Sequence, residues 1–273
     1  MKPAAFDYLR AGTAQGALDA LAQYGEDARV LAGGQSLMAV LNMRLAQPKV
    51  LIDISRTAEL DSVRVDTRAG HFVVGAAATQ GSVEWRASLH DEVPLLALAF
   101  PHISHFQIRN RGTVCGSIAH ADPSAELPLV LSALGGDVML RSKKKHRTLA
   151  AQDFFQGMLM TAREPDELVE AVRFPLRKPG ERYGFSEFSA RHGDFAIVAC
   201  AAVVRDDSIR IAVGGVADRP VTETWPALTG DDLRGALNDL SWKLNAQDDA
   251  YISAKYRRNL VRQLGWRVIE EAK

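Results

Sequence analysis

The sequence predicts an α+β protein with mixed sheets. Stretches with the apolar spacing of amphipathic helices are interleaved with short apolar runs typical of strands. The 273 residues are 47% hydrophobic and 24% charged, which is the composition of an ordinary globular protein. No internal repeat or low-complexity linker interrupts the pattern. The length suffices for one large domain or two small ones, and we expect two or three packed units.

The N-terminal part of the chain predicts two helices and two strands. The run "TAQGALDALAQYG" predicts an amphipathic helix that ends at Gly25, and "ARVLAG" predicts a short strand. The run "SLMAVLNMRLA" predicts a second helix, with one apolar face formed by Leu37, Val40, Leu41 and Leu45. After Pro48, "KVLIDIS" predicts another strand.

Three further strands are predicted in the middle of the chain, in "HFVVGAAAT", "DVMLRS" and "DELVEAVRFP". The basic run "RSKKKHR" at 141–147 predicts a solvated hairpin turn. At 174–184, the prolines, glycines and basic residues of "FPLRKPGERYG" interrupt the apolar pattern and predict a domain boundary. Beyond it we expect three strands, in "FSEFSA", "FAIVACAAVVRD" and "SIRIAVGGVAD", followed by helices.

The charge balance and the apolar pattern exclude several partners. Because the formal net charge is +0 at pH 7, no long-range field attracts a nucleic-acid backbone or an anionic membrane surface. The longest apolar stretch, "FAIVACAAVV" at 195–204, is too short to cross a bilayer, and the N-terminus lacks the apolar core of a signal peptide. We therefore expect a cytoplasmic protein with no nucleic-acid partner and no membrane insertion.

The two cysteines, Cys115 and Cys200, form no C-x-x-C site. Two thiolates cannot hold an ordinary iron–sulfur cluster, which takes four ligands, mostly cysteine. No residue set typical of a metal site or of a nucleophile–base pair is evident, so we expect neither a metal ion nor a catalytic residue in this chain. Any clusters that serve this protein are expected on another chain.

A first glycine segment lies in "LAGGQSLMAVLNMRLAQP", residues 31–48. A strand that leads through Gly33 and Gly34 into a helix capped by Ser36 would leave unpaired N–H groups facing a ligand, and an anion suits such a site. The segment is neither a P-loop nor the G-x-G-x-x-G of a dinucleotide-binding unit. A glycine pair is also common in simple turns, so this pattern alone leaves both interpretations open.

A second glycine segment lies in "ISHFQIRNRGTVCGSIAHADPSAELPLVLSALGGDV", residues 103–138. It predicts a long polar loop with Gly112 and Gly116, and then a helix with Asp122 as its cap and Pro123 in its first turn. Glycines 135 and 136 end this helix, whose buried face is formed by Leu127, Val130, Leu131 and Leu134. Long loops inside a compact domain are more often functional than idle.

These segments closely resemble the FAD-binding medium subunit of the molybdenum hydroxylases, the family of carbon monoxide dehydrogenase, xanthine dehydrogenase and bacterial N-heterocycle hydroxylases. The resemblance is carried by "LAGGQSLMAVLNMRLAQPKVLIDI" and "IRNRGTVCGSIAHADPSAELP". Further matches lie in "DFFQGMLMTAREPDELVEAVRFP", "GDFAIVACAAVV", "IRIAVGGVADRPV" and "AYISAKYRRNLVRQLGWRVIEEA". Together these stretches cover nearly the whole chain in order.

The resemblance implies a fold and a domain division. Residues 1–176 are expected to form a FAD-binding domain of the vanillyl-alcohol-oxidase-like (PCMH) type, with subdomains of about 1–55 and 56–176. Residues 177–273 are expected to form a C-terminal domain like that of the carbon monoxide dehydrogenase flavoprotein, with a three-stranded antiparallel sheet and helices.

The resemblance also implies which residues bind FAD. The first glycine segment is expected to hold the diphosphate through backbone donors of Leu31, Ala32, Gly33, Gly34, Gln35, Ser36 and Leu37. The second is expected to close on the diphosphate and ribityl chain through Thr113, Val114, Gly116 and Ser117. Ile103 and Ser104 are expected to pass close to the cofactor, and Glu126 to contact its hydroxyls. Val169 is expected near the adenine or ribityl part, and Phe195 either over the isoalloxazine or in the core.

Three departures from the family pattern modify these expectations. Gln35 stands where relatives often have His, which removes a candidate for covalent attachment, so we expect non-covalent FAD. Cys115 replaces a common glycine, so its side chain must point away from the phosphates. Where some relatives carry a lysine near the flavin, this chain offers Glu187 and Ser189, which leaves the flavin potential and the electron acceptor open.

Other polar residues have simpler expected roles. We expect His102 and His120 to be packing or loop residues rather than bases. Arg109 and Arg111 are expected to be solvated or to face another subunit rather than to bind phosphate. Asp53 and Asp194 are expected to form caps or turns.

The function implied by the resemblance is electron relay. A large subunit would carry molybdopterin, a small subunit would carry two [2Fe–2S] clusters, and the FAD of this chain would pass electrons to an external acceptor, within a dimer of heterotrimers. Two alternatives remain at this point. One is a self-contained FAD-dependent oxidoreductase with its own small-molecule substrate, and the other is a phosphate-ligand-binding module with no redox role.

Overall fold

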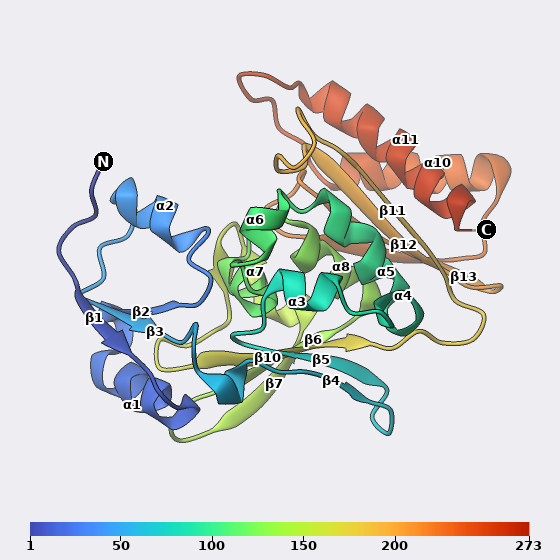
Figure 1. Ribbon diagram of the computed structural model, residues 1–273. Helices are drawn as coiled ribbons and strands as arrows, with labels where there is room; N and C mark the ends of the chain where they lie inside the picture. Colours follow the sequence, from blue (N-terminus) through green and yellow to red (C-terminus); the bar gives the residue numbers. More distant parts are fainter. Residues whose placement is uncertain (273) are drawn as a thin grey trace.

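The computed structural model describes residues 1–272 and confirms the α+β class (Figure 1). A small N-terminal unit lies to one side, a five-stranded sheet with short helices occupies the centre, and a second sheet with two long helices lies on the far side. Each sheet has one kind of strand pairing. The N-terminal sheet is parallel, and the other sheets are antiparallel. No helix of residues 1–272 is long and apolar enough to span a membrane.

The N-terminal unit is a parallel sheet in the order β1-β3-β2, packed against α1. The elements are β1 (Asp7–Arg10), α1 (Ala14–Tyr24), β2 (Ala28–Leu31) and β3 (Val50–Asp53). Thr13 caps α1 by accepting a hydrogen bond from the Gly16 N–H at 3.0 Å, and Gly25 ends it with φ of 50°, as predicted. Ala17, Leu18, Leu21 and Ile52 form the centre of its core.

The second predicted helix is shorter than its apolar spacing indicates. Helix α2 spans only Leu37–Asn42, and the Ser36 side chain does not cap it. Leu41 is buried, but Leu45 is 73% exposed, so the predicted apolar face is wrong. The small sheet already has α1 against it, which leaves α2 on the other side of the unit, without a core of its own to bury that face (Figure 1).

The central sheet has the strand order β4-β5-β10-β6-β7 and is antiparallel throughout. Its strands are β4 (Val63–Asp66), β5 (His71–Gly75), β6 (Asp137–Arg141), β7 (His146–Ala150) and β10 (Leu168–Pro175). The basic run is the turn between β6 and β7, as predicted. A small hairpin follows, formed by β8 (Phe155–Gly157) and β9 (Met160–Thr161).

Short helices cover one face of this sheet (Figure 1). They are α3 (Gln80–Glu84), α4 (Leu89–Glu92), α5 (Pro94–Ala99), α6 (Phe106–Arg109), α7 (Val114–His120), α8 (Glu126–Leu134) and α9 (Ala151–Phe154). The predicted long loop of the second glycine segment therefore contains α6 and α7. Their pattern was missed because each is only one or two turns long, too short to show a helical period.

Helix α8 begins later than predicted. It starts at Glu126, and Asp122 instead accepts a hydrogen bond from the Ser124 N–H at 2.9 Å, which forms a turn before the helix. Pro128 lies in the first turn, where no N–H is needed. Gly135 ends the helix with φ of 70°, as predicted. Leu127, Val130 and Leu131 are fully buried, and Leu129 on the other side is buried too, because sheets lie on both sides of this helix.

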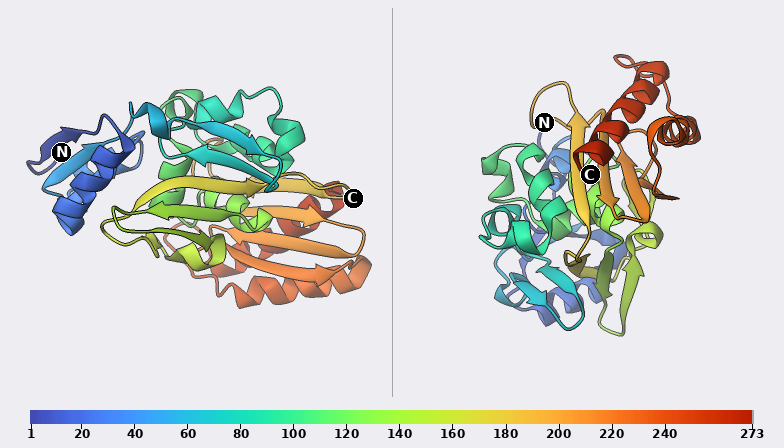
Figure 2. Two further views of the ribbon diagram at one scale, coloured as in Figure 1. Left: turned by 90° about the horizontal axis from the view of Figure 1, so that it is seen from below. Right: turned by 90° about the vertical axis from the view of Figure 1, so that its right-hand side faces the viewer.

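The C-terminal sheet has four strands rather than the predicted three, in the order β11-β12-β13-β14. They are β11 (Arg182–Phe188), β12 (Val198–Val204), β13 (Ser208–Gly214) and β14 (Val221–Pro226). The missed strand, β14, is an edge strand with no fully buried residue, so it lacks the apolar alternation that marks the others. Helices α10 (Gly230–Lys243) and α11 (Ala254–Glu271) cover one face of the sheet (Figure 2).

The other face of the C-terminal sheet packs on α5 and α8 of the central unit. Phe185, Ala199 and Ala201 of this sheet share one buried cluster with Phe72 and Val172 of the central sheet. The connection between β10 and β11 runs through the predicted boundary at 174–184, but the apolar core continues across it. The domain division remains a prediction that this shared core neither requires nor excludes.

Candidate cofactor-binding site

A cavity of about 780 Å³ lies between the N-terminal unit and the short helices of the central unit. Both glycine segments line it, together with the start of α8, the strand β10 and the loop between β11 and β12. The predicted site residues that line it are Ala32, Gly33, Gly34, Gln35, Ser36, Leu37, Ile103, Ser104, Thr113, Gly116, Ser117, Glu126, Val169 and Phe195. Residues predicted from separate parts of the sequence are therefore brought together by the fold.

Two predicted site residues do not line this cavity. Val114 lies between Thr113 and Gly116 in the second segment, but its side chain is fully buried in the apolar core, so it supports the segment from beneath. Leu31 borders a smaller adjoining cavity of about 430 Å³, which also contains Asp53 and Arg111. It ends β2 and positions the segment that follows.

The first glycine segment presents its backbone to the cavity. Within the described chain, the N–H groups of Gly33, Gly34, Gln35 and Ser36 have no hydrogen-bond acceptor. Gly34 has φ of 72°, which favours glycine, and the Gln35 side chain donates to the Gly33 carbonyl at 2.8 Å. Several adjacent unpaired N–H groups form a concave site for an anion.

The second glycine segment is held by the core beneath it. Thr113 accepts a hydrogen bond from the Gly116 N–H at 2.9 Å and so caps α7. The Gln80 N–H donates to the Gly112 carbonyl at 2.7 Å, which joins the segment to α3. The Cys115 thiol donates to the Val74 carbonyl at 3.3 Å and is buried, which raises the pKa of the thiol. The Cys115 side chain is thus directed into the core, as expected.

The two segments touch at Gly33. A Cβ atom there would lie 2.1 Å from the Arg111 carbonyl oxygen and 2.6 Å from the Gly112 Cα. These are backbone atoms that no rotamer change can move. Glycine at position 33 therefore lets the two segments meet, and their meeting joins the two sides of the cavity.

Glu126 supplies a carboxyl group to the cavity wall. It is the first residue of α8, and it is only 5% exposed. Burial raises the pKa of this carboxyl to about 7, and the nearby Glu187 carboxylate contributes in the same direction. Because the group titrates near neutral pH, it can either donate or accept a hydrogen bond from a ligand.

Phe195 lies in the loop between β11 and β12 rather than in the core. It is 58% exposed and lines the cavity, so the alternative of a core residue is wrong. The loop closes where the Ile197 N–H donates to the Phe188 carbonyl at 2.8 Å. An exposed aromatic ring at a cavity edge is suited to stacking on a planar ligand.

Several residues that line the cavity were missed by the sequence analysis. The Gln80 side chain is 6% exposed, and its Oε1 atom has no hydrogen-bond partner in the described chain. The half-buried His120 also lines the cavity, and desolvation lowers the pKa of its imidazole. Arg163 and Glu167 line it near β10. The position of Gln80 directly after Thr79, the cap of α3, offered a sequence signal. His120 ends α7 and was expected to be a packing or loop residue, and Arg163 and Glu167 lie in the irregular connection before β10.

Four other polar residues had predicted roles, of which one is corrected and three are confirmed. Arg109 is 8% exposed and bonds to both carboxylate oxygens of Glu84 at 2.7 and 2.8 Å, so it is neither solvated nor free to bind phosphate. Arg111 is exposed, as expected. Asp53 accepts a hydrogen bond from the Ser55 N–H, and the Asp194 N–H donates to the Arg191 carbonyl, which confirms both as turn formers.

Comparison with known proteins connects this geometry to a family. The profile described as "FAD binding domain in molybdopterin dehydrogenase" matches residues 4–177, and "CO dehydrogenase flavoprotein C-terminal domain" matches residues 183–272. The chain belongs to the FAD-binding medium subunits of the molybdenum hydroxylases. This medium subunit is therefore a component of an oxidoreductase, and it carries the FAD-binding domain of its family.

Individual relatives cover the whole chain. The nicotine 6-hydroxylase medium subunit of Paenarthrobacter nicotinovorans is 37% identical over 100% of this chain and 99% of its own length. A structure of reconstituted CO dehydrogenase from Oligotropha carboxidovorans has a TM-score of 0.94 and 31% identity, covering 100% of this chain and 99% of that one. Quinoline 2-oxidoreductase from Pseudomonas putida 86 gives 0.92 and 32%, with coverage of 100% and 98%.

Proposed function

We propose that this chain is the FAD-carrying electron-transfer subunit of a heteromeric molybdenum hydroxylase. It would take electrons from [2Fe–2S] clusters of a small partner subunit and deliver them through FAD to an external acceptor. A large partner subunit would carry molybdopterin and the substrate site, and two such heterotrimers would form the complete enzyme. The observation that supports this proposal best is a cavity with unpaired backbone N–H groups in a chain of this family.

The residues of the cavity fit FAD. Four consecutive N–H groups without acceptors suit a diphosphate, and the orphan Oε1 of Gln80 and the carboxyl of Glu126 suit hydroxyl or amide donors of the cofactor. When bound, FAD supplies transfer of one or two electrons. In this chain, no His is present at Gln35 to attach it covalently, which supports a dissociable cofactor.

The roles we assign to the chain are binding, orientation and exclusion of water. The first glycine segment would hold the diphosphate, Glu126 and Ser117 would orient the ribityl hydroxyls, and Phe195 would cover the ring system. Residues 1–272 contain no group of three or more His, Cys, Asp or Glu side chains placed to hold a metal ion. Cys115 and Cys200 are both buried and unpaired with each other. These features support a relay that relies on partner subunits for the substrate chemistry.

The proposal is tested by reconstitution. The isolated chain with FAD should be bleached by a chemical reductant, but it should not be reduced by an organic substrate of the complex. Addition of the iron–sulfur subunit alone should leave this unchanged, and addition of both partners with substrate should reduce the flavin. Flavin reduction by substrate in the isolated, metal-free chain would instead show a self-contained FAD-dependent oxidoreductase. A chain that takes up no FAD would contradict the proposal altogether.

A further inference from the structure

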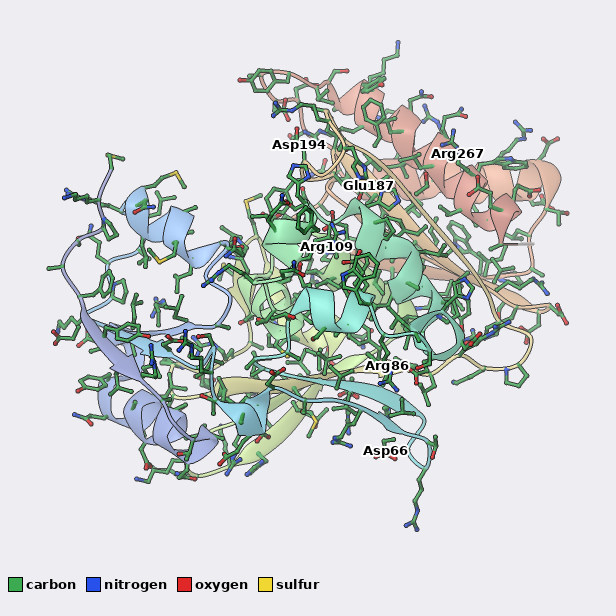
Figure 3. All side chains as sticks on the ribbon, viewed as in Figure 1. Asp66, Arg86, Arg109, Glu187, Asp194 and Arg267 are labelled. Carbon is green, nitrogen blue, oxygen red and sulfur yellow. The ribbon has the colours of Figure 1, made fainter. Side chains whose placement is uncertain are left out.

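One end of the cavity is formed by two segments from different parts of the chain. The turn of residues 102–105 contributes Ile103 and Ser104, and the hairpin loop of residues 189–197, between β11 and β12, contributes Gly193 and Phe195. Figure 3 shows Glu187 at the base of this hairpin loop and Asp194 within it. The turn and the hairpin loop have no common secondary structure to fix their separation.

The turn is fixed on one side by Arg109. Its guanidinium donates to the Ile103 carbonyl at 2.7 Å and to the Ser104 carbonyl at 3.3 Å, while Glu84 neutralises its charge. Ser104 has φ of 45°, a left-handed conformation that is unfavourable for a residue other than glycine. Arg109 thus holds the turn in a shape that it would not adopt alone.

The hairpin loop lies directly against this turn. Gly193 has φ of 86°, and a Cβ atom there would be 3.0 Å from the Ser104 carbonyl oxygen and 3.1 Å from the His105 Cε1. The Gly193 backbone therefore packs against the Ser104 carbonyl and the His105 ring. It leaves no space for a larger residue at position 193.

A partly buried ion pair connects the same two segments, with the His102 side chain 33% exposed. Glu187 Oε1, near the end of β11, lies 3.4 Å from His102 Nδ1, and the Glu187 side chain is only 3% exposed. The other carboxylate oxygen, Oε2, is buried and has no hydrogen-bond partner in residues 1–272. The His102 ring also packs on Phe185 of the same strand, with ring centroids 5.0 Å apart. A carboxylate buried in this way is costly without a cation beside it, and a protonated His102 supplies that cation.

We propose that Glu187 and His102 form a positioning pair that holds the hairpin loop of residues 189–197 against the turn of residues 102–105 and so fixes this end of the cavity. If the proposed function holds, the cofactor bound at this end of the cavity is FAD. The pairing itself does not depend on a ligand. Glu187 does not line the cavity, so it acts through the loop rather than by contact with the cofactor. No acid–base step is assigned to either residue.

The electrostatic surroundings support a charged His102. The Glu187 carboxylate raises the pKa of His102, and Glu126 of α8 adds to this effect, whereas burial opposes it. The other titratable groups near the pair are Asp122, whose charge acts on Glu126, and His192, whose ring centroid lies 6.2 Å from that of His102. Because the folded-state pKa of His102 is raised, the pair is complete below the ordinary histidine pKa of about 6.5 and is lost as the pH rises through the raised value.

The test compares two buried carboxylates at opposite ends of β11: Glu187 lies within the strand, and Glu181 immediately precedes it. Glu187→Gln removes the charge of the pair and keeps the size of the side chain. Glu181→Gln is the matched control, because Glu181 is 7% exposed, pairs with Arg205 at 2.5 Å and lies outside the cavity. Amide hydrogen exchange of residues 189–197 is measured in the full chain without FAD at pH 6, and the dissociation constant of FAD is then measured by fluorescence titration.

Glu187→Gln should speed exchange at the Asp194 and Ile197 amides by about tenfold or more and weaken FAD binding by about three- to tenfold. Glu181→Gln should change thermal stability but neither of these two quantities. His102→Gln and the double variant with Glu187→Gln should match the single Glu187→Gln variant, because either change removes the same pair.

Unchanged exchange in Glu187→Gln, or equal changes in both glutamine variants, would overturn the proposal, as would additive effects in the double variant. The exchange experiment uses no cofactor, so it decides the pairing even if wild-type protein fails to bind FAD. Failure of wild-type protein to bind FAD would contradict the proposed function instead.

Discussion

The two glycine segments of the cavity both lead into a short helix, but the rest of the chain holds them very differently. The first leaves four N–H groups without acceptors in residues 33–36 and continues into α2, of which only Leu41 is buried. The cavity-facing part of the second, residues 112–117, is bonded to Ala78, Gln80 and Val74 of the central unit, and four of its residues are buried: Gly112, Thr113, Val114 and Cys115.

This difference assigns the two sides of the cavity separate tasks. The second segment is part of the apolar core, so its shape is set before any ligand arrives. The first segment is stabilised by few contacts and has donors that only a ligand can satisfy, so a ligand should order it. Similar glycine content therefore produces a preformed wall on one side and a wall completed by binding on the other.

The largest expected effect comes from breaking the contact between the two segments. In Gly33→Ala the new Cβ would meet backbone atoms of residues 111 and 112, which must move apart. We expect FAD binding to weaken by about 100-fold, or about 2.7 kcal/mol, while cooperative unfolding is retained because both cores are untouched. Isothermal titration measures the affinity, and near-ultraviolet circular dichroism checks the fold.

Gly12→Ala is the matched control, since nothing lies within 4 Å of a Cβ at position 12 in the same unit. It should bind FAD as wild type does. Loss of cooperative unfolding in Gly33→Ala would show that the first segment is part of the core. An unchanged FAD affinity would show that the contact between the two segments is not needed for binding.

The next effect is the pH dependence of FAD affinity, which we expect to be set by Glu126 in the preformed wall of the cavity. Its pKa of about 7 means that about a tenth of the carboxyls are ionised at pH 6 and about nine-tenths at pH 8. If the carboxylate accepts hydrogen bonds from FAD hydroxyls, affinity should rise about tenfold over this range, and protons should be released on binding. Glu126→Gln should flatten the profile, as titrations in buffers of different ionisation enthalpy would show.

Stability of the apoprotein gives an independent check of the same group. A folded-state pKa raised above the ordinary value of 4.5 means that the fold loses stability as the pH rises from about 4.5 through 7. The loss from Glu126 is about 3 kcal/mol at most, and Glu126→Gln should remove it. A slope of affinity in the opposite direction, with weaker binding at pH 8, would mean that the neutral carboxyl donates to the cofactor.

A smaller effect is expected from removal of the threonine caps of α1 and α7. The two caps make the same hydrogen bond, but only the cap of α7 lines the cavity. Thr113→Val and Thr13→Val each remove a threonine oxygen that accepts from an N–H three residues later. Both should lower the free energy of unfolding by about 1 kcal/mol. Only Thr113→Val should also weaken FAD binding, since Thr13 lies outside the cavity. Equal affinities in the two variants would indicate that the second segment does not need its cap to bind.

The sequence predicted most of the core elements and most of the cavity lining, for identifiable reasons. Elements with a long apolar period, such as α1 and β12, and helix ends marked by Gly25 and Gly135 were predicted correctly. Helices of one or two turns, such as α6 and α7, are too short to show the apolar repeat of a helix in the sequence. The edge strand β14 lacks buried residues, so its pairing depends on its neighbour rather than on its own pattern.

The site residues that belong to local sequence motifs were predictable. Those that reach the site only through tertiary contacts were not. The glycine segments were identified from local sequence, but Gln80 enters the cavity only because α3 packs beside the second segment. Arg109 was expected to be solvated or to face another subunit, because charged residues are seldom buried without a partner, and its burial depends on Glu84, which is distant in sequence. Pairs of this kind cannot be inferred from the spacing of either residue.

The smallest expected effect concerns Ser36, which the sequence predicted as a helix cap. Its side chain makes no capping bond, so Ser36→Ala should change the free energy of unfolding by less than about 0.5 kcal/mol. A true cap at this position would cost about 1 kcal/mol, as expected for Thr113, so chemical denaturation distinguishes the two cases. Because the backbone N–H of Ser36 is unchanged, FAD affinity should also remain within about twofold of wild type if the first segment binds only through its main chain. A larger loss of affinity with unchanged stability would mean that the Ser36 hydroxyl itself contacts the cofactor, and the first segment would then be more than a row of backbone donors.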